Sequence, residues 1–163
     1  MSILSNSKTF YINLIIIISI FILDRLTKLY VIYLDKINSG SEIFSSKFLN
    51  VYLIWNDGIA FGLFSFDQNY LYNFLTLFIL LIILVILRMI FKSSGFKKYS
   101  LLMIFGGALG NVFDRIIYKA VPDFIDFHIG NFHWFIFNVS DIFISLGVLL
   151  LISLELVNNK KEK

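Results

Sequence analysis

The sequence predicts an all-α membrane protein with four transmembrane helices and a small β-structured extracytoplasmic loop region. Two observations carry this prediction. Of the 163 residues, 58% are hydrophobic, against roughly 45–50% in soluble domains, and the mean hydropathy is +0.83. The chain also contains four long apolar runs, each long enough to span a membrane. We therefore expect a single integral membrane domain over residues 1–163.

The predicted spans are residues 10–34, 71–91, 99–118 and 138–157. About 20–25 residues are enough for a helix to cross roughly 30 Å of hydrocarbon. The first run is too long for a secretory signal, contains Asp24, Arg25 and Lys28, and lacks a clear small-residue cleavage site. We therefore predict that it is a retained membrane anchor.

The distribution of lysine and arginine predicts the orientation of the chain. Three lysines lie in the short segment 92–98, with Arg88 just before it, and three more lie in the C-terminal tail. Lys8 precedes the first span, whereas the lysines of segments 35–70 and 119–137 are fewer and more dispersed. We expect both termini in the cytoplasm and these two segments as outer loops.

Both outer loops contain β-strand signals. Residues 48–56, "FLNVYLIWN", are rich in Val, Ile, Tyr and Trp, which favour strands. Residues 124–137 have Gly130-Asn131 between two aromatic runs, a pattern typical of a hairpin. Trp55 and Trp134 fit a belt of aromatic side chains at the membrane interface.

Polar side chains gather in the half of each predicted span that lies next to the outer loops. They are Asp24, Lys28, Asn73, Thr76, Asn111, Asp114, Arg115, Asn138 and Asp141. Four segments that run in alternate directions would not agree on one depth by chance, and ionisable groups within a membrane mark functional sites. The inner halves are nearly bare of such groups, so we expect a site that opens to the outer side only.

Spacing within the spans supports a common site. Asp24 and Lys28 are four residues apart on one helical face, with the acid in the favourable N-terminal position. Asn111 and Arg115 have the same spacing. We expect Asp24 and Lys28 to form a structural ion pair that holds the first span against the others, and Arg115 to brace loop carbonyls or bound peptide.

Two further local patterns concern helix contacts and helix ends. Gly106 and Gly110 form a small-xxx-small step, which lets a neighbouring helix approach closely. Asn138 is suited to cap the last span. Asp141 would then stand at the third helical position, where the positive helix end favours a carboxylate.

Five motifs together resemble those of the lipoprotein signal peptidases, or signal peptidase II, a family of bacterial membrane aspartyl proteases. They are "DRLTK" (24–28), "NDGIAFG" (56–62), "GGALGNVFDR" (106–115), "VPDFIDF" (121–127) and "FNVSD" (137–141). They occur in the family's order and cover nearly the whole chain. Each motif alone is weak, but the series is specific. Two small departures are Ile59, where the family often has a small residue, and Ser140, where alanine is usual.

The resemblance implies an enzyme of the bacterial cytoplasmic membrane that removes signal peptides from prolipoproteins, by cleaving before a diacylglyceryl-modified cysteine. It implies Asp123 and Asp141 as the catalytic pair. The supporting or substrate-binding residues that we expect are Asp24, Lys28, Asn56, Gly58, Asn111, Asp114, Arg115 and Asn138. The expected partners are lipid-modified prolipoproteins and membrane lipid.

The residue types also constrain the chemistry. The chain has no cysteine, so thiol catalysis and disulfides are excluded. His128 and His133 lack a third ligand at useful spacing, so we expect interfacial loop residues rather than a metal site. Hydrolysis is left to two carboxylates and a water molecule, with one proton shared between the acids. We expect no cofactor, no nucleic acid partner and a monomer.

Several alternatives remain open at this point. Asp126 is a possible catalytic residue in place of Asp123, and Asp114 is more simply explained by an ion pair than by a catalytic role. A proton-coupled transporter or channel subunit would also place acids within the membrane. It would need polar groups along the full depth, however. An assembly factor without chemistry would leave the aspartates unexplained. Accumulation of uncleaved lipoprotein precursor in cells lacking the chain would distinguish the peptidase.

Overall fold

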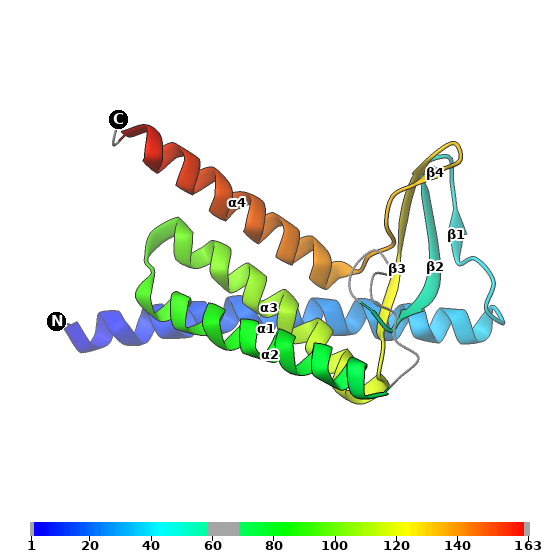
Figure 1. Cartoon of the computed structure of the whole chain (residues 1–163), viewed down its shortest axis with the longest axis horizontal. Helices are drawn as coiled ribbons and strands as arrows, with labels where there is room; N and C mark the ends of the chain where they lie inside the picture. The colour runs from blue at the N-terminus through cyan, green and yellow to red at the C-terminus, as the bar shows by residue number, and fades with distance from the viewer. Residues whose placement is uncertain (1, 59–68, 162–163) are drawn as a thin grey trace.

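The computed structural model describes residues 2–58 and 69–161, which form a helical bundle with a small sheet across one end (Figure 1). The elements are α1 (Ser2–Ile37), β1 (Phe44–Ser45), β2 (Leu49–Asn56), α2 (Asn69–Lys92), α3 (Gly95–Tyr118), β3 (Val121–Ile129), β4 (Phe132–His133) and α4 (Val139–Lys161). Positions 59–62 of the second motif, including Ile59, lie outside the described residues.

Each predicted span coincides with a helix, although α4 begins one residue after the predicted start at 138, and the helices otherwise extend beyond the predicted ends by up to eight residues. α1 begins eight residues before its predicted span, at Ser2. α3 begins at Gly95 rather than at residue 99, so only Ser93 and Ser94 connect it to α2. Such a short connection requires the two helices to run antiparallel, side by side.

Within the described residues, three helices are long and apolar enough to cross a membrane. These candidate spans are Tyr72–Lys92, Gly95–Tyr118 and Val139–Asn158. The mostly helical fold with a small antiparallel sheet is therefore confirmed, together with three of the four predicted spans. The fourth span, in α1, stays a prediction. α1 carries Asp24, Arg25 and Lys28 within its predicted span, which lowers its apolar character.

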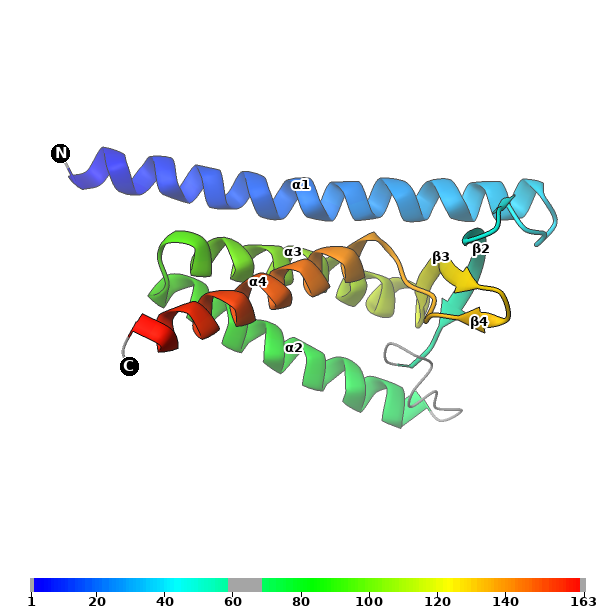
Figure 2. The same ribbon diagram turned by 90° about the horizontal axis from the view of Figure 1, so that it is seen from above.

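α3 is the central helix and packs against each of the other three. The apolar core lies mainly between α2 and α3 and comprises Ile83, Ile90, Leu101, Leu102, Phe105 and Val112. Viewed from above, α1 runs along the whole bundle as a long, nearly straight helix (Figure 2). The two chain ends lie at one end of the bundle and the sheet lies at the other (Figure 1).

The small-residue step of α3 brings the helices close together, as predicted. A Cβ atom on Gly106 would approach Ile20 of α1 to 3.2 Å. A Cβ on Gly110 would collide with the side chains of Asp24 in α1 and Ser140 in α4. The absence of a side chain at Gly110 therefore leaves room for polar groups of α1 and α4 to meet beside α3.

The strands form one antiparallel sheet in the order β1-β2-β3-β4, which joins the two outer loops. The predicted strand at 48–56 is confirmed as β2, and the predicted hairpin at 124–137 is confirmed as β3 and β4. Gly130 at its turn has a φ of 60°, a conformation that glycine adopts without strain. The pairing of β2 with β3 was not predictable, because 65 to 78 residues separate their paired positions.

A β-bulge in β2 places the side chains of Asn50 and Asn56 on opposite faces of the sheet. Val51 pairs with Ile125 and Ile54 pairs with Asp123, so two residues of β2 oppose one of β3. In a regular strand Asn50 and Asn56 would lie on the same face. The bulge changes the face between them. Asn50 consequently lies opposite Asp126, whereas Asn56 reaches Asp123.

Candidate active site

Asp123 and Asp141 meet at the junction of the sheet and the helices. Asp123 lies on β3 and Asp141 lies in the first turn of α4. Asn138 contacts both carboxylates: its side-chain Nδ2 donates to Asp123 Oδ1 at 2.6 Å, and its backbone N–H donates to Asp141 Oδ2 at 3.1 Å. One residue therefore fixes the two acids relative to each other, although 18 positions separate them in the sequence.

Asn138 holds this position because it caps α4, as predicted. Its Oδ1 accepts the backbone N–H of Asp141 at 3.1 Å, while the Asp141 carboxylate accepts the N–H of Asn138. This reciprocal arrangement is a capping box, in which each side chain satisfies a backbone donor at the helix start. The capping of α4 and the orientation of Asp141 are thus the same interaction.

The carboxylate of Asp123 is buried, with 3% of the residue exposed. Its hydrogen-bond partners among the described residues are side-chain amides. Besides Asn138, Asn56 Nδ2 donates to its Oδ2 at 2.8 Å. Burial, and next to it the charge of Asp141, raise the pKa of Asp123 to about 6, against the opposing effect of the two amide hydrogen bonds. Asp123 can therefore gain or lose a proton in a moderately acidic range.

The other carboxylate, Asp141, is held by α3. Asn111 Nδ2 donates to Asp141 Oδ1 at 2.8 Å, and Lys28 Nζ donates to Asn111 Oδ1 at 2.8 Å. An ammonium group has donors but no acceptor, so it can contact only the oxygen of the Asn111 amide. Lys28 thereby turns the NH₂ group of Asn111 toward Asp141.

All three asparagines around the acids are oriented in this way, because a donor contacts the Oδ1 atom of each side-chain amide. The Oδ1 of Asn111 faces the ammonium of Lys28, that of Asn56 accepts the N–H of Gly58 at 3.0 Å, and that of Asn138 accepts a helical N–H. Each NH₂ group is left to point at a carboxylate. The amides thus provide donors of fixed direction without adding positive charge to the aspartate pair.

A cluster of four ionised side chains lies beside the pair, with Lys28 at its centre. Lys28 Nζ lies 3.0 Å from Asp24 Oδ1 and 2.7 Å from Asp114 Oδ2. Arg25 completes the cluster: its Nη2 lies 2.7 Å from Asp24 Oδ2 and 2.7 Å from Asp114 Oδ2, and its Nη1 also contacts Asp114. Two acids and two bases balance formally. The predicted Asp24–Lys28 pair is present, and Asp114 has the ion-pair role that we preferred for it.

The ion cluster also holds the start of α4. Asp24 Oδ1 accepts the backbone N–H of Ser140 at 3.0 Å. This bond and the contact of Lys28 with Asn111 connect α1 to the two helices that position Asp141. The serine that departs from the family's usual alanine is fully buried, and its backbone, not its hydroxyl, makes this contact.

Arg115 braces the loop that follows β2. Its Nη2 donates to the carbonyl of Gly58 at 2.6 Å, and Nη1 donates to the carbonyl of Asn111 at 3.4 Å. The predicted contact between Arg115 and a loop carbonyl is therefore present. Because Gly58 also donates to Asn56, Arg115 supports one of the amides that hold Asp123.

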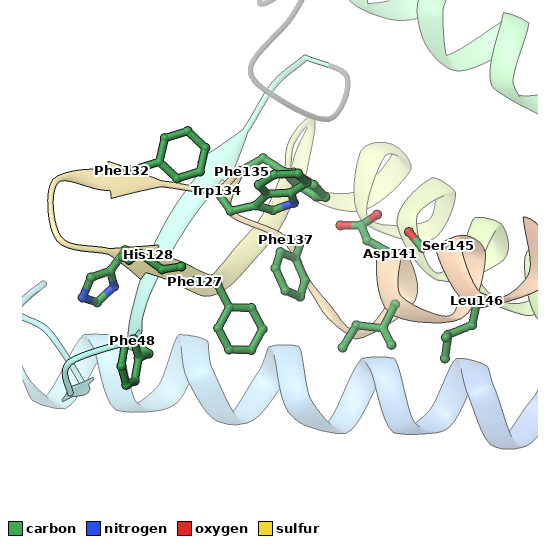
Figure 3. Close-up of a pocket in the computed structure, with 12 residues that line it drawn as sticks. Phe48, Phe127, His128, Phe132, Trp134, Phe135, Phe137, Asp141, Ser145 and Leu146 are labelled. Atoms are coloured by element: carbon green, nitrogen blue, oxygen red, sulfur yellow. The ribbon is translucent and has the colours of Figure 1, made fainter. Parts of the chain in front are cut away.

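An apolar pocket of about 730 Å³ opens beside Asp141. Aromatic side chains from β3, the segment after β4 and the segment before β2 line one part, and Ile142, Ser145 and Leu146 of α4 line another. Figure 3 shows the carboxylate of Asp141 directed into the space between Phe137 and Trp134 on one side and α4 on the other. The site thus combines a pair of carboxylates with a surface suited to apolar groups.

Asp126 is not part of this pair. It lies three residues after Asp123, so the two side chains project from opposite faces of β3. The fully buried Asp126 carboxylate contacts His133 Nδ1 at 2.9 and 3.1 Å. His128 lies close by, so the expectation that the two histidines have no third ligand nearby is wrong. The spacing in the sequence did not predict this cluster of three side chains, because the pairing of strands brings them together.

Sequence analysis did not assign a role to Arg25, which lies within the first motif. Its guanidinium contacts both acids of the ion cluster and lies 5.0 Å from the ring centre of Phe113. The signal that could have identified it is its position next to Asp24 in an apolar helix. A charge at that depth requires a partner.

Fold and site together define a class of protein: a membrane-embedded hydrolase with an aspartate pair at one end of a helical bundle. A family model described as "Signal peptidase (SPase) II" matches residues 16–157. The chain belongs to the signal peptidase II family, whose members are membrane proteases. The transporter, channel and assembly-factor interpretations are therefore set aside.

Curated relatives cover nearly the whole chain. A lipoprotein signal peptidase of Pelagibacter ubique (strain HTCC1062) is 54% identical over 157 residues, covering 96% of this chain and 95% of its own length. That of Aquifex aeolicus (strain VF5) is 39% identical, covering 89% of this chain and 86% of its own. That of Anaplasma phagocytophilum (strain HZ) is 37% identical, covering 89% and 92%.

Two solved structures share the fold, and both are described as bacterial membrane enzymes. One has a TM-score of 0.72 and 28% identity, and the match covers 93% of this chain and 91% of that one. The other has a TM-score of 0.68 and 29% identity, with 88% and 92% covered. Their similarity supports the fold as well as the membrane location of this chain.

Proposed function

We propose that this chain is an aspartic endopeptidase that removes the signal peptide from diacylglyceryl-modified prolipoproteins, by cleaving before the lipidated cysteine. Asp123 and Asp141 act as the acid–base pair on a water molecule. The observation that carries this assignment is the double contact of Asn138, which ties the two carboxylates to one residue. The curated relatives named lipoprotein signal peptidase support the substrate class.

The pair works by exchanging protons with water and substrate. We assign the shared proton to Asp123, because burial and the nearby charge of Asp141 place its pKa at about 6, where it can exchange a proton. Asp141, ionised, takes a proton from water as the water oxygen attacks the scissile carbonyl, and Asp123 donates a hydrogen bond to that carbonyl. The proton taken by Asp141 then passes to the leaving amine, which completes hydrolysis with no other reactant.

The eight supporting residues divide into three groups by their contacts. Asn56, Asn111 and Asn138 give donors to the acids. Asp24, Lys28 and Asp114 belong to the ion cluster that aligns α1, α3 and α4. Gly58 and Arg115 brace the loop behind Asn56. Each group acts on the acids through fixed contacts, and no metal or other cofactor is required for the proposed steps.

The aromatic pocket is the proposed place for the apolar part of the substrate. Its lining beside Asp141 suits lipid chains or the apolar residues of a signal peptide. α1 supplies the fourth span, because apolar side chains such as Ile15, Ile22 and Leu26 are exposed along it. With both termini in the cytoplasm, the sheet and the acids lie at the outer face of the cell membrane, where exported precursors arrive. We propose that the chain works there as a monomer.

Cleavage of a lipid-modified precursor in reconstituted vesicles tests this proposal. Asp123→Asn and Asp141→Asn should each lower the cleavage rate by about 10²–10⁴-fold, as expected for loss of an acid or base. Glu42→Gln, which alters an exposed acid of the same outer region, should leave the rate unchanged. Near wild-type cleavage by either folded aspartate variant would refute the pair, and normal lipoprotein processing in cells lacking the chain would refute the function.

A further inference from the structure

We propose that Asp126, His128 and His133 form a binding site for one divalent zinc ion on the β3–β4 hairpin. One ligand atom from each residue lies within 4.8 Å of the other two. The set combines two imidazoles with a carboxylate, which are common zinc ligands, and leaves the fourth tetrahedral position to water. The site is separate from the aspartate pair and plays no part in the proposed hydrolysis.

The hairpin itself brings the three side chains to one face. Asp126 and His128 are two residues apart on β3, so both project to the same side of the sheet. His133 of β4 is the register partner of His128. Asp123 of β3 is an odd number of positions from Asp126 and from His128, so its side chain projects to the other face of the sheet. A metal ion at the three ligands would therefore not contact the catalytic water.

The spacing of two of the ligands already suits zinc. His133 Nδ1 lies 2.9 and 3.1 Å from the oxygens of Asp126. Two ligands at about 2.0–2.1 Å from a tetrahedral zinc ion are separated by about 3.3 Å. A small outward movement of the exposed His133 ring, which is on the surface of the hairpin, would therefore admit the ion between them.

His128 supplies the independent observation that points to a ligand. Its Nδ1 is buried, and no hydrogen-bond partner for it occurs among the described residues. A buried polar atom without a partner is costly. The ring stacks on that of His133 with centroids 5.0 Å apart and planes at 22°. A plain Asp126–His133 ion pair would leave this nitrogen unexplained, whereas a shared metal ion gives it a partner after a side-chain rotation.

Asp126 adds an electrostatic reason for a cation. Its carboxylate is fully buried, and the single imidazole of His133 is its ion-pair partner among the described residues. A divalent ion would balance this negative charge and tie the end of the hairpin together beside the apolar pocket, to which His128 contributes.

The test uses the full chain in detergent micelles, purified without a polyhistidine tag and stripped of metal, with Zn²⁺ alone as the probe. The chain contains two histidines, so histidine-selective ¹⁵N labelling gives signals from two rings. One equivalent of Zn²⁺ should shift the ring signals of both histidines together. A shift of one ring alone, or of neither, would overturn the proposal.

Two ligand variants and a matched control sharpen the result. Asp126→Asn and His128→Phe should each weaken Zn²⁺ binding by more than about tenfold in calorimetry, since loss of even an outer partner has effects of that size. The phenylalanine keeps an aromatic ring for stacking but has no nitrogen ligand, so it also serves if the Asp126 variant fails to fold. Glu42→Gln should bind as the wild type does.

Wild-type affinity in either folded ligand variant would overturn the site. These measurements do not involve precursor cleavage. A failure of the metal site and a failure of the proposed peptidase function are therefore distinguishable.

Discussion

Two groups of buried carboxylates lie side by side in this protein, and they are held in opposite ways. Asp24 and Asp114 are surrounded by the cations of Arg25 and Lys28. Asp123 and Asp141 are held by the N–H groups of asparagines. The two groups differ in what balances their charge.

The difference shows how the same type of side chain can have a structural role in one group and be available for proton exchange in the other. In the ion cluster, two cations are paired with two carboxylates. Amides orient a carboxylate but do not neutralise it. Burial and the nearby charge of Asp141 raise the pKa of Asp123 to about 6, so this acid can exchange a proton. Lys28 connects the two groups, because it is at once the centre of the cluster and the group that orients Asn111.

The largest expected effect comes from breaking the cluster. Lys28→Met leaves Asp24 and Asp114 with one cation between them and should lower the free energy of unfolding by about 3–5 kcal/mol, because a buried charge loses its partner. Denaturation in detergent measures this. Lys97→Met is the control, since the ion pair of Lys97 with Glu155 is about half exposed and should contribute no more than about 1 kcal/mol. Equal losses would contradict the proposed role of the cluster.

Removing one amide should affect rate more than stability. Asn111→Leu deletes the donor to Asp141, and a hydrogen bond to a charged group contributes about 1.5–3 kcal/mol. The expected loss is about 10–100-fold in kcat with little change in KM, because Asn111 positions the acid and does not bind substrate. Steady-state cleavage kinetics measure both. Asn73→Leu on the exposed face of α2 should leave them unchanged, and a change in KM alone would argue against positioning.

Adding a methyl group to α3 at Gly110, where this helix meets α1 and α4, should have an intermediate effect on the free energy of unfolding. The Cβ of Gly110→Ala meets the side chains of Asp24 and Ser140, which belong to two other helices. Overpacking of this kind costs about 1–3 kcal/mol. Gly106→Ala meets Ile20 at 3.2 Å and should cost less, because this apolar neighbour can shift slightly. Thermal unfolding of the two variants compares them, and a greater loss for Gly106→Ala would contradict the close approach at Gly110.

The smallest effect is a shift in pH dependence. The pair works with one proton, so kcat/KM should fall as pH rises through about 6, the pKa of Asp123. Asn56→Ala removes a hydrogen bond that lowers this pKa, so the falling limb should move to higher pH. A limb that moves to lower pH would contradict the assignment of the proton to Asp123.

The same pKa has a consequence for stability. It lies above the ordinary value of 3.8, so protonation of Asp123 stabilises the folded state. This contribution is fully present below pH 4 and is lost as pH rises through about 6. Asp123→Asn has no proton to lose, so its unfolding free energy should lack this component of the pH dependence.

Much of the fold was predictable because the hydrophobic pattern is strong. Apolar runs of span length predicted the helices, and the β-rich composition of residues 48–56 predicted β2. Asn138 and Asp141 were predictable as a helix start from their spacing alone. The neighbourhood of Asp126 and the two histidines was not predictable, since it depends on contacts between strands.

The sequence by itself determined the membrane character, the helices and the chemical types at the site, because these follow from local composition, spacing and a motif series. Only the tertiary structure decided which acids are neutralised and which are left to titrate. That choice rests on the bulge in β2, on the close approach at Gly110, and on the donor-only ammonium of Lys28, which fixes the direction of an amide 83 residues away in the chain.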